Sequence, residues 1–550
     1  MRTGGRAARV SRPHPPLRPF GGASVWAPTG QQSAEIDRLA IESRGVHQPV
    51  LMENAGRSAA MVLCRLFPTG PVLGLVGAGN NGGDALVLLR TLRAWGREAE
   101  AVLVADRPED EPLLHGWDLP LHRDQALDEA AWRALLASAA VVVDGVLGTG
   151  ASGAPRERQA AAVARLNRSG RPVLALDVPS GVDASTGAVP AEAVRAAVTV
   201  AFGGPKLGSL LHPARPLAGR LVAVEIGFPP PVPGEADALL VTPAWAHEHL
   251  PTRSTDTHKN AVGRCLVVAG AVGMAGAAVL AARGALRAGA GIVRVCSASA
   301  NREVIQAAVP EAIYVDVSDA DALAAAVEES DAVAAGPGLG TDEHARRVLD
   351  AVVGARPAGV VLDADALNVA AAGALDLSAL AARAPLLITP HPGEMARLLP
   401  AADDGADRLA IVRRAAARFG CSVLLKGAPS LVAAAGAPVL VDTQGSSDLA
   451  AAGMGDMLTG VCTALLAQGA TPQVAGALGL YSSGRAARIA GRGASLTPSD
   501  VARWLSDALG EVAAPGEAAA PGEGRGAGEA HWGVSDLGLP FVTYDADPPR

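Results

Sequence analysis

Short apolar runs alternate with longer amphipathic segments through most of this chain. In the N-terminal half the runs occupy residues 72–76, 141–143 and 173–176, and each ends at a polar cluster. The C-terminal half repeats the pattern at residues 266–269, 332–335, 360–362, 386–389 and 423–425. Because strands that alternate with helices fold as parallel sheets with crossover connections, we predict an α/β protein with two such domains.

A proline-rich break separates the two series. Residues 229–234, with the sequence PPPVPG, can continue neither a strand nor a helix. We therefore predict a first domain with a Rossmann-like parallel sheet at 29–230, a Pro-rich linker at 231–249 and a second α/β domain at 250–511. We predict two tails. Residues 1–28 form a basic segment with five arginines and are expected to be disordered, and residues 512–550 include a low-complexity stretch rich in Ala, Pro, Gly and Glu.

Composition narrows the possible functions. The formal net charge is −8, which argues against a nucleic-acid partner because phosphate binding requires clustered Lys and Arg. Two long uncharged stretches, 265–282 and 457–484, are interrupted by glycine or turn residues and do not predict membrane spans. The five cysteines are scattered and form no C-x-x-C pair, so we expect reduced core thiols in a cytoplasmic protein.

The first polar cluster, GAGNNGGD at residues 77–84, follows a predicted strand and precedes a helical stretch at 85–95. Its glycines match the G-x-G-x-x-G fingerprint of turns in which the backbone approaches a dinucleotide pyrophosphate. Asp84, however, would repel a pyrophosphate at the helix N-terminus. We infer a turn that suits a polar ligand or a cation instead.

Two further strand ends bring polar side chains to the same crevice, because the strands of a parallel sheet end at one edge. Asn81, Asp144 and Ser180 would offer one negative charge among neutral oxygens, a donor set that favours a hard monovalent cation. Asp177 would remain free as a proton carrier, with Lys206 as the partner that adjusts its pKa. The alternative is structural: a strand-end aspartate often caps the next helix, and Lys206 alone is typical of a solvated surface lysine.

Longer motifs identify a resemblance. The segments SAEIDRLAIESRGVHQPVLMENAG (33–56), GAGNNGGD, DGVLGTG (144–150) and LDVPSGVDASTG (176–187) make the first domain resemble the NAD(P)H-hydrate epimerases, which interconvert the R and S epimers of NAD(P)H hydrates. Ala85 replaces the family's usual glycine, and we expect the turn to tolerate its methyl group. The resemblance implies catalysis by Asp177 and a potassium site at Asn81, Asp144 and Ser180. It also implies substrate contacts at Asn80, Asn81, Gly82, Gly83, Asp84, Gly148, Thr149, Gly150, Ala151, Ser152, Gly153, Ala154, Asp177 and Lys206.

The second domain carries a comparable series of polar strand ends. A glycine-rich turn, GMGD at 453–456, opens a predicted helix from 457; such a turn offers converging amides to a phosphoryl group, and Asp456 can take a hydroxyl proton. We interpret the series as phosphoryl-transfer machinery. His391 alone, beside prolines, is typical of a packed or capping side chain. The other members are the loops 270–276 and 336–340, DADALN (363–368), PHPGE (390–394) and LKG (425–427).

This series, together with HKNAVG (258–263), resembles the ADP- or ATP-dependent NAD(P)H-hydrate dehydratases, which have a ribokinase-like α/β/α fold. In that family a phosphoryl group is transferred to the hydroxyl of the hydrate, and phosphate then leaves to restore NAD(P)H. The resemblance implies ADP and magnesium as cofactors, with Glu394 or water relaying the metal's charge, and Asp456 as the base. It also implies hydrate contacts at Ala277, Gly338, His391 and Asp456, and nucleotide contacts at Lys426, Gly427, Ala428, Pro429, Ser430 and Gly455.

Two segments depart from the dehydratase pattern. Residues 445–448 are GSSD where the family commonly has Gly-Asn-Pro-Gly, and residues 451–452 are Ala-Ala in place of Thr-Gly. Because Asp456 and the helix-opening glycines are kept, we expect activity to persist with an altered anion site.

We therefore predict a bifunctional repair enzyme that epimerises NAD(P)H hydrates and dehydrates the S form with ADP, giving AMP and phosphate. Its partners would be these small molecules and further copies of itself. One alternative is a ribokinase-like small-molecule kinase with an N-terminal ligand-binding module. The others are a first domain that only binds a ligand, and a conventional dehydrogenase.

Overall fold

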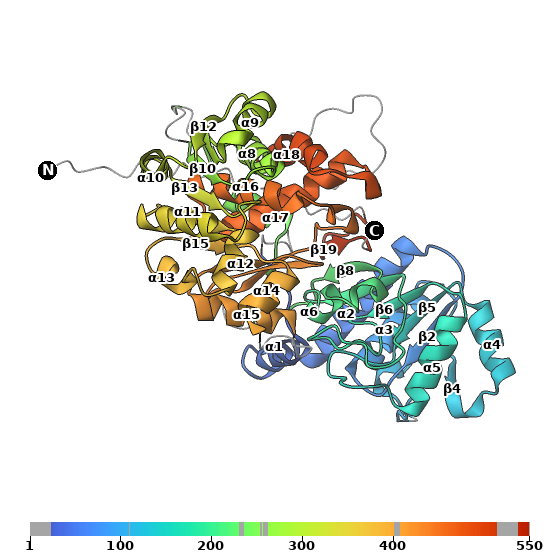
Figure 1. The fold of residues 1–550 in the computed structure, drawn as a ribbon. Helices are drawn as coiled ribbons and strands as arrows, with labels where there is room; N and C mark the ends of the chain where they lie inside the picture. Colours follow the sequence, from blue (N-terminus) through green and yellow to red (C-terminus); the bar gives the residue numbers. More distant parts are fainter. Residues whose placement is uncertain are drawn as a thin grey trace.

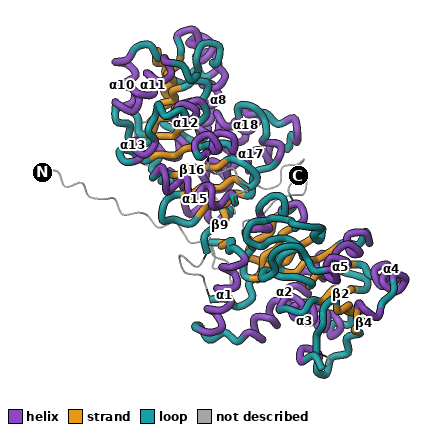
Figure 2. The backbone as a smooth tube through the Cα atoms, turned by 60° about the horizontal axis from the view of Figure 1, so that its bottom comes forward, coloured by secondary structure: helices purple, strands orange, loops and turns teal. Residues whose placement is uncertain are grey.

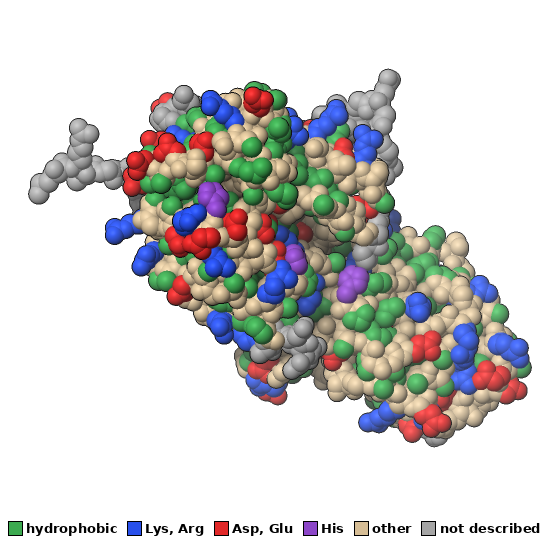
Figure 3. Space-filling model, in the orientation of Figure 1, with side chains coloured by type: hydrophobic (Ala, Val, Ile, Leu, Met, Phe, Trp, Pro, Cys, Tyr) green, Lys and Arg blue, Asp and Glu red, His purple; other side chains and the backbone are tan. Residues whose placement is uncertain are grey.

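The computed structural model describes residues 24–108, 110–229, 236–253, 256, 262–400, 407–513 and 537–548. Two domains lie side by side, and each has helices packed on its β-sheet (Figures 1 and 2). This arrangement confirms the predicted α/β class with two parallel-sheet domains. On the face shown in Figure 3, acidic and basic side chains are interspersed.

The first domain contains an eight-stranded sheet in the order β19-β8-β7-β6-β5-β2-β3-β4, in which every neighbouring pair except β19 and β8 is parallel. Helices α2 and α3 cover one face, and α4 and α5 cover the other. The elements are α1 (Gly30–Glu42), α2 (Gln48–Leu66), β2 (Val72–Val76), α3 (Asn80–Ala94), β3 (Ala99–Leu103), β4 (Leu121–Arg123), α4 (Glu129–Ser138), β5 (Val141–Gly145), α5 (Glu157–Arg168), β6 (Val173–Leu176), β7 (Val198–Phe202), α6 (Leu207–Leu210), β8 (Arg220–Val224) and β19 (Val542–Ala546).

The second domain contains an eleven-stranded sheet in the order β1-β9-β18-β17-β16-β15-β14-β13-β10-β11-β12. Strands β10 to β16 are parallel, while β17 is antiparallel to both of its neighbours. The elements are β1 (Val25–Trp26), β9 (Ala238–Leu240), α7 (Pro243–His249), β10 (Arg264–Val268), α8 (Ala275–Arg287), β11 (Ile292–Ser297), α9 (Arg302–Ala308), β12 (Ile313–Asp316), α10 (Ala320–Glu328), β13 (Ala332–Ala335), α11 (Glu343–Gly354), β14 (Val360–Leu362), α12 (Asp365–Ala371), α13 (Leu377–Ala381), β15 (Leu386–Ile388), α14 (Pro392–Leu398), α15 (Arg408–Phe419), β16 (Ser422–Leu425), β17 (Ser430–Ala433), β18 (Val439–Asp442), α16 (Met454–Ala467), α17 (Pro472–Ala490) and α18 (Pro498–Ala513).

Each sheet has one point where the order of its strands reverses. In the first domain the chain adds β3 and β4 on one side of β2 and then returns to place β5 on the other side. In the second domain it adds β11 and β12 beside β10 and returns to place β13 on the opposite side. Ligands of open α/β sheets bind in the crevice at such a switch point, outside the C-terminal ends of the strands.

Parts of the predicted tails and linker form regular secondary structure, so the prediction was wrong there. Strand β1 pairs with β9 in the second sheet, and β19 pairs with β8 in the first sheet. The predicted linker also contains β9 and α7. These short strands escaped prediction because each is stabilised by a partner far away in the sequence. The rest of the predicted tails, 1–23 and most of 512–550, lies outside the described residues, as does most of HKNAVG.

The segments near the two ends of the chain, around β1 and β19, join the two domains. Val25 and Ala27 pack in one buried cluster with Leu207 and Leu221 of the first domain and with apolar side chains of the second sheet. The Tyr544 hydroxyl also lies 3.0 Å from the Thr443 hydroxyl of the second domain. The first and second domains therefore share part of their hydrophobic core.

Two helix starts differ from their predicted positions. Helix α3 begins at Asn80 and α16 at Met454, so the polar residues predicted to form turns lie in the first turns of these helices. Gly79 and Gly453 occupy the N-cap positions, and neither helix requires a capping side chain. Cys265, Cys296, Cys421 and Cys462 are buried free thiols, as predicted. Among the described residues, no helix is both long and apolar enough to cross a bilayer.

Candidate active sites

A cavity of about 480 Å³ lies at the switch point between β2 and β5. Several residues expected to contact substrate do not line it: Gly82 and Gly83 are buried within α3, and residues 152–154 lie outside the cavity wall. A Cβ atom at Gly82 would come within 2.1 Å of the Gly77 carbonyl oxygen, so this glycine serves close packing. The expected residues that do line the cavity are Asn80, Asn81, Asp84, Gly148, Thr149, Gly150, Ala151, Asp177 and Lys206.

Asp177 and Lys206 form a buried ion pair in this cavity. Lys206 is only 2% exposed, so the alternative of a solvated surface lysine is wrong. Its ammonium also donates to the Phe202 carbonyl oxygen at 2.7 Å, and the Phe202 amide donates to the Asp177 carboxylate at 3.1 Å. Asp177 has a φ of +64°, a conformation that is costly for a residue with a side chain and that is concentrated at functional sites.

Two more carboxyl groups, Asp84 and Asp37, line the same cavity. Burial, together with the nearby Asp177 and Asp37 carboxylates, holds the pKa of Asp84 well above its usual range. Burial raises the pKa of Asp37 to about 6 against the opposing effect of Lys206. The cavity therefore holds one paired carboxylate beside two carboxyl groups whose pKa is raised, a combination suited to general acid–base chemistry.

The expected potassium ligands are adjacent and buried. The Ser180 hydroxyl donates to Asp144 at 2.6 Å, and the Asn81 amide nitrogen donates to the Leu147 carbonyl oxygen at 2.7 Å. The Asn81 Oδ1 atom is buried and has no hydrogen-bond partner. A buried oxygen without a donor is costly, and a cation beside Asp144 would satisfy it. These three side chains therefore fit a hard monovalent ion.

The Ala85 methyl group is accommodated by a neighbouring glycine. Ala85 is fully buried in α3, and a Cβ atom on Gly145 would lie only 2.6 Å from the Ala85 Cβ. The absence of a side chain at Gly145 therefore leaves the space that the methyl group occupies.

In the second domain, a buried charge network connects the ends of β14 and β16 with the start of α16. The Lys426 ammonium donates to Asp363 at 2.6 Å, and the Thr459 hydroxyl donates to the other Asp363 carboxylate oxygen at 2.8 Å. Gly455 lies directly against this network, since a Cβ atom there would be 3.0 Å from the Lys426 Nζ. Lys426 and Gly455, both expected to contact the nucleotide, are thus brought together.

Asp456 and Glu394 lie near this network. Burial, then the Asp363 carboxylate, raises the pKa of Asp456 against the effect of Lys426. Burial likewise raises the pKa of Glu394, which is 5% exposed. His391 caps α14: its Nδ1 accepts the Gly393 amide at 3.0 Å, as the structural alternative predicted. Its side chain is half exposed, which leaves the ring edge accessible.

The remaining expected contacts form two groups. A Cβ atom on Gly338 would lie 3.1 Å from the Ala277 Cβ, so these two expected hydrate contacts are adjacent. Residues 426–430 form the tight connection between the antiparallel strands β16 and β17. Arg408 donates to the carbonyl oxygens of Lys426 and Ala428 at 3.1 and 3.4 Å and so supports this loop.

Sequence reasoning missed four side chains of these sites. Asp37 and Asp363 lie inside the motifs at 33–56 and 363–368. These motifs point to both residues, although no role was predicted for either. Arg408 lies in a helix whose sequence carries no recognisable motif, and Thr459 lies three residues after the GMGD motif in α16. Their proximity to Lys426 follows from tertiary packing alone.

Comparisons with known proteins match both domains. A family model described as NAD(P)H-hydrate dehydratase matches residues 265–507, and one described as YjeF-related protein N-terminus matches residues 48–208. A bifunctional NAD(P)H-hydrate repair enzyme of Moorella thermoacetica is 36% identical over 498 residues, which cover 85% of this chain and 93% of that protein. The chain belongs to the family of bifunctional NAD(P)H-hydrate repair enzymes.

Other known proteins match most of the chain or its second half. The repair enzyme of Gloeobacter violaceus is 38% identical over 470 residues, covering 80% of this chain and 90% of that protein. A solved ADP/ATP-dependent NAD(P)H-hydrate dehydratase of Bacillus subtilis, co-crystallised with ATP and Mg²⁺, is 26% identical, with a TM-score of 0.43 over 49% of this chain and 97% of that one. Family membership makes the chain an enzyme with an epimerase and a dehydratase domain and leaves less support for the kinase alternative.

Proposed function

We propose that this enzyme restores NAD(P)H from its hydrates in two steps. The first domain interconverts the R and S epimers, and the second dehydrates the S epimer with ADP, giving AMP and phosphate. The observation that carries the proposal is the buried Asp177–Lys206 pair beside Asp84 and Asp37, two carboxyl groups whose pKa is raised by burial. Inversion at the hydroxyl-bearing carbon requires one proton to be removed and one supplied, and this cavity offers a group for each task.

In the first step, Asp177 is the proton acceptor that faces the substrate. Lys206 holds the Asp177 carboxylate in place through their ion pair. Asp84, whose pKa is held well above its usual range, is the group that supplies a proton, and Asp37 is the other carboxyl group in the cavity. The loop residues Gly148 to Ala151 and Asn80 line the cavity and position the nicotinamide end of the dinucleotide.

Asn81, Asp144 and Ser180 are the side chains proposed to hold potassium. A monovalent cation there would stabilise the start of α3 and the loop after β5, and it would supply positive charge beside the substrate. Replacing potassium by choline in the buffer should then slow epimerisation while dehydration of pure S hydrate continues. An unchanged epimerisation rate would remove the ion from the proposal.

In the second step, the hydrate's hydroxyl needs to become a better leaving group. Asp456 is the base that takes its proton while the terminal phosphoryl group of ADP is transferred to the oxygen. Lys426 and the Gly455 amide face the phosphates, and residues 427–430 contact the nucleotide. Magnesium bound to the phosphates would neutralise their charge. Glu394, a buried carboxyl group, is the candidate protein ligand for this ion.

A coupled assay tests both steps. The enzyme, ADP and magnesium are incubated with an equal mixture of R and S NADH hydrates, and recovery of the reduced nicotinamide absorbance is followed. The wild type should recover the whole mixture, Asp177→Asn only the S fraction, and Asp456→Asn neither. Recovery limited to the S fraction in the wild type would contradict the epimerase step, and a stable phosphorylated hydrate would favour the kinase alternative.

We also infer that the enzyme acts in the cytoplasm, where its dinucleotide substrates are used, and that it forms a homo-oligomer. Light scattering on the purified full-length chain tests the second point. A monomeric mass at micromolar concentration would contradict it.

A further inference from the structure

The second domain holds another cavity, which is lined by parts of the loops 270–276 and 336–340 but by none of the expected hydrate or nucleotide contacts. It has a volume of about 320 Å³ and lies among the loops that follow β10, β11 and β13. Val272, Val317 and Leu339 give it apolar walls, and Ser297, Asp342 and His344 give it polar ones. The proposed two-step mechanism leaves this cavity without a role.

Its position is that of a ligand site. It lies at the switch point of the second sheet, between β10 and β13, where open α/β sheets bind ligands. The corresponding switch point of the first sheet, between β2 and β5, is the candidate epimerase cavity. The two loops at the second switch point are joined directly, since the Ala271 amide donates to the Gly338 carbonyl oxygen at 2.6 Å.

The cavity also continues the dehydratase site along the same sheet edge. Gly338 is an expected hydrate contact, and the next residue, Leu339, forms part of the cavity wall. From β14, which carries Asp363, to β11 the sheet advances three strands, or about 14 Å at roughly 4.8 Å per strand. A dinucleotide bound in an extended conformation along this edge, with its nicotinamide end near Asp456, would direct its adenosine end toward the cavity.

The walls suit a purine base. Val272 is 76% exposed and Met274, in the same loop, is 51% exposed, which is unusual for large apolar side chains. Val272, Val317 and Leu339 line the cavity and provide apolar surface on which a planar base can pack. A base held there would also cover the apolar side chains that the loop leaves in water.

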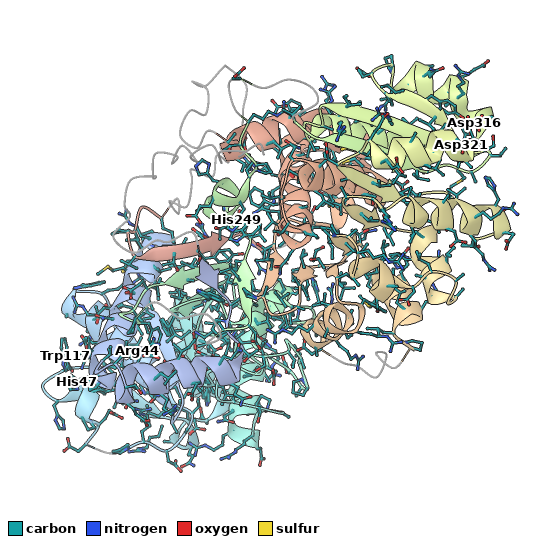
Figure 4. The ribbon with its side chains drawn as sticks, turned by 90° about the vertical axis from the view of Figure 1, so that its left-hand side faces the viewer. Arg44, His47, Trp117, His249, Asp316 and Asp321 are labelled. Atoms are coloured by element: carbon teal, nitrogen blue, oxygen red, sulfur yellow. The ribbon has the colours of Figure 1, made fainter. Side chains whose placement is uncertain are left out.

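The charge of the cavity distinguishes two dinucleotides. None of the side chains that line it is Lys or Arg, and the only one that can become cationic is His344. The Asp342 Oδ1 atom accepts the Ala345 amide at 2.9 Å as the cap of α11, which leaves Oδ2 to accept a ribose hydroxyl. Asp316, labelled in Figure 4 beside Asp321, precedes the wall residue Val317 but does not line the cavity, and Arg302 lies near it. The Asp342 carboxylate would repel a phosphate group.

We propose that this cavity binds the adenosine half of the hydrate and selects the 2′-hydroxyl of NADH hydrate over the 2′-phosphate of NADPH hydrate. The proposal rests on the dehydratase function proposed above. In this proposal Asp342 accepts a hydrogen bond from the ribose 2′-hydroxyl, as an acidic residue does in dinucleotide-binding folds.

The test compares three pure S hydrates on the full-length enzyme: those of NADH, NADPH and the reduced nicotinamide mononucleotide, which lacks the adenosine half. We expect kcat/KM to be at least tenfold higher for NADH hydrate than for either of the others. Asp342→Ser keeps a helix-capping oxygen but removes the charge, and it should bring the NADH-to-NADPH ratio close to one. Asp376→Ser, at the cap of α13 and away from the cavity, is the matched control and should leave the ratio unchanged.

A second variant tests the base-binding wall. Val272→Asp changes an exposed side chain, so the protein should fold normally, and it should raise KM for NADH hydrate without affecting the mononucleotide hydrate. Equal kcat/KM values for NADH and mononucleotide hydrates, or a ratio unmoved by Asp342→Ser, would overturn this proposal. Failure of the dehydratase function would look different, because none of the three hydrates would then be converted.

Discussion

Lys426 and Asp363 are paired at 2.6 Å beneath the glycine turn that opens α16. Asp363 is 1% exposed, and Thr459 donates to its second oxygen. Burial opposes ionisation of this carboxyl group, but the Lys426 charge and the hydrogen bonds outweigh burial and hold its pKa below the usual range. The pair therefore fixes the position of the lysine expected to face the phosphates.

Asp363→Asn should weaken both folding and dehydration. It leaves a largely buried ammonium without a counter-charge, so we expect the free energy of unfolding at pH 7 to fall by roughly 2–3 kcal/mol. Because the pKa of Asp363 is lowered, its contribution is present above about pH 4 and is lost as the pH falls below that value. Urea denaturation at several pH values measures the effect.

The control is Asp331→Asn, which breaks the Arg264–Asp331 pair, whose side chains are each about a third exposed. That variant should lose less than about 1 kcal/mol. Equal losses in the two variants would contradict a special role for the Lys426–Asp363 pair.

Asp177→Asn should abolish epimerisation without unfolding the first domain. Asparagine tolerates the positive φ at this position, so the backbone should be preserved. Removal of the proton acceptor should lower the epimerisation rate by roughly 10²–10⁴-fold, while the S hydrate is still dehydrated. Asp183→Asn, in the same loop but bonded only to local amides and a hydroxyl, is the control and should keep most of the rate.

The strands and the residues at their ends were predictable because parallel sheets follow simple rules. Runs such as Val72–Val76, Val173–Leu176 and Ala332–Ala335 are continuous, apolar and buried on both faces, and their bounds match the structure. The same rules place Asn81, Asp144 and Asp177 at one edge. Other residues of the cavity were harder to predict from the sequence. Asp37, for example, lies in α1, more than 30 residues before the first strand of this parallel series at Val72.

The pairing of β1 with the second sheet and of β19 with the first could not be predicted from the local sequence pattern. β1 contains two residues, and β19 follows a long low-complexity stretch, so neither shows the alternation of a strand. Their stability comes from β9 and β8, which are more than 200 and 300 residues away. Local sequence carries little information on pairings of that range.

Asp37→Asn should stabilise the protein at neutral pH while reducing epimerisation. Because the folded pKa is raised to about 6, ionisation of Asp37 destabilises the folded state as the pH rises from about 4 to 6. The Asn variant should avoid this cost, gaining roughly 3 kcal/mol at pH 7.5 and almost nothing at pH 4. Glu35→Gln, on the exposed face of the same helix, is the control. A wild type and an Asp37→Asn variant with parallel stability profiles would show that Asp37 is ionised freely in the folded state.

Removal of β19 should destabilise the first domain and loosen its connection to the second. Deletion of residues 541–550 would expose the edge of β8 and break the Arg220–Asp545 ion pair, which has N–O distances of 2.7 and 2.8 Å. It would also remove the Tyr544–Thr443 hydrogen bond, so we expect calorimetry to show a loss of roughly 5 °C or more in Tm. Tyr544→Phe keeps the ring and loses only the hydroxyl, and it should cost about 1 kcal/mol. A deletion variant that unfolds at the wild-type temperature would show that the strand contributes nothing, whereas two separated transitions would show that β19 couples the unfolding of the two domains.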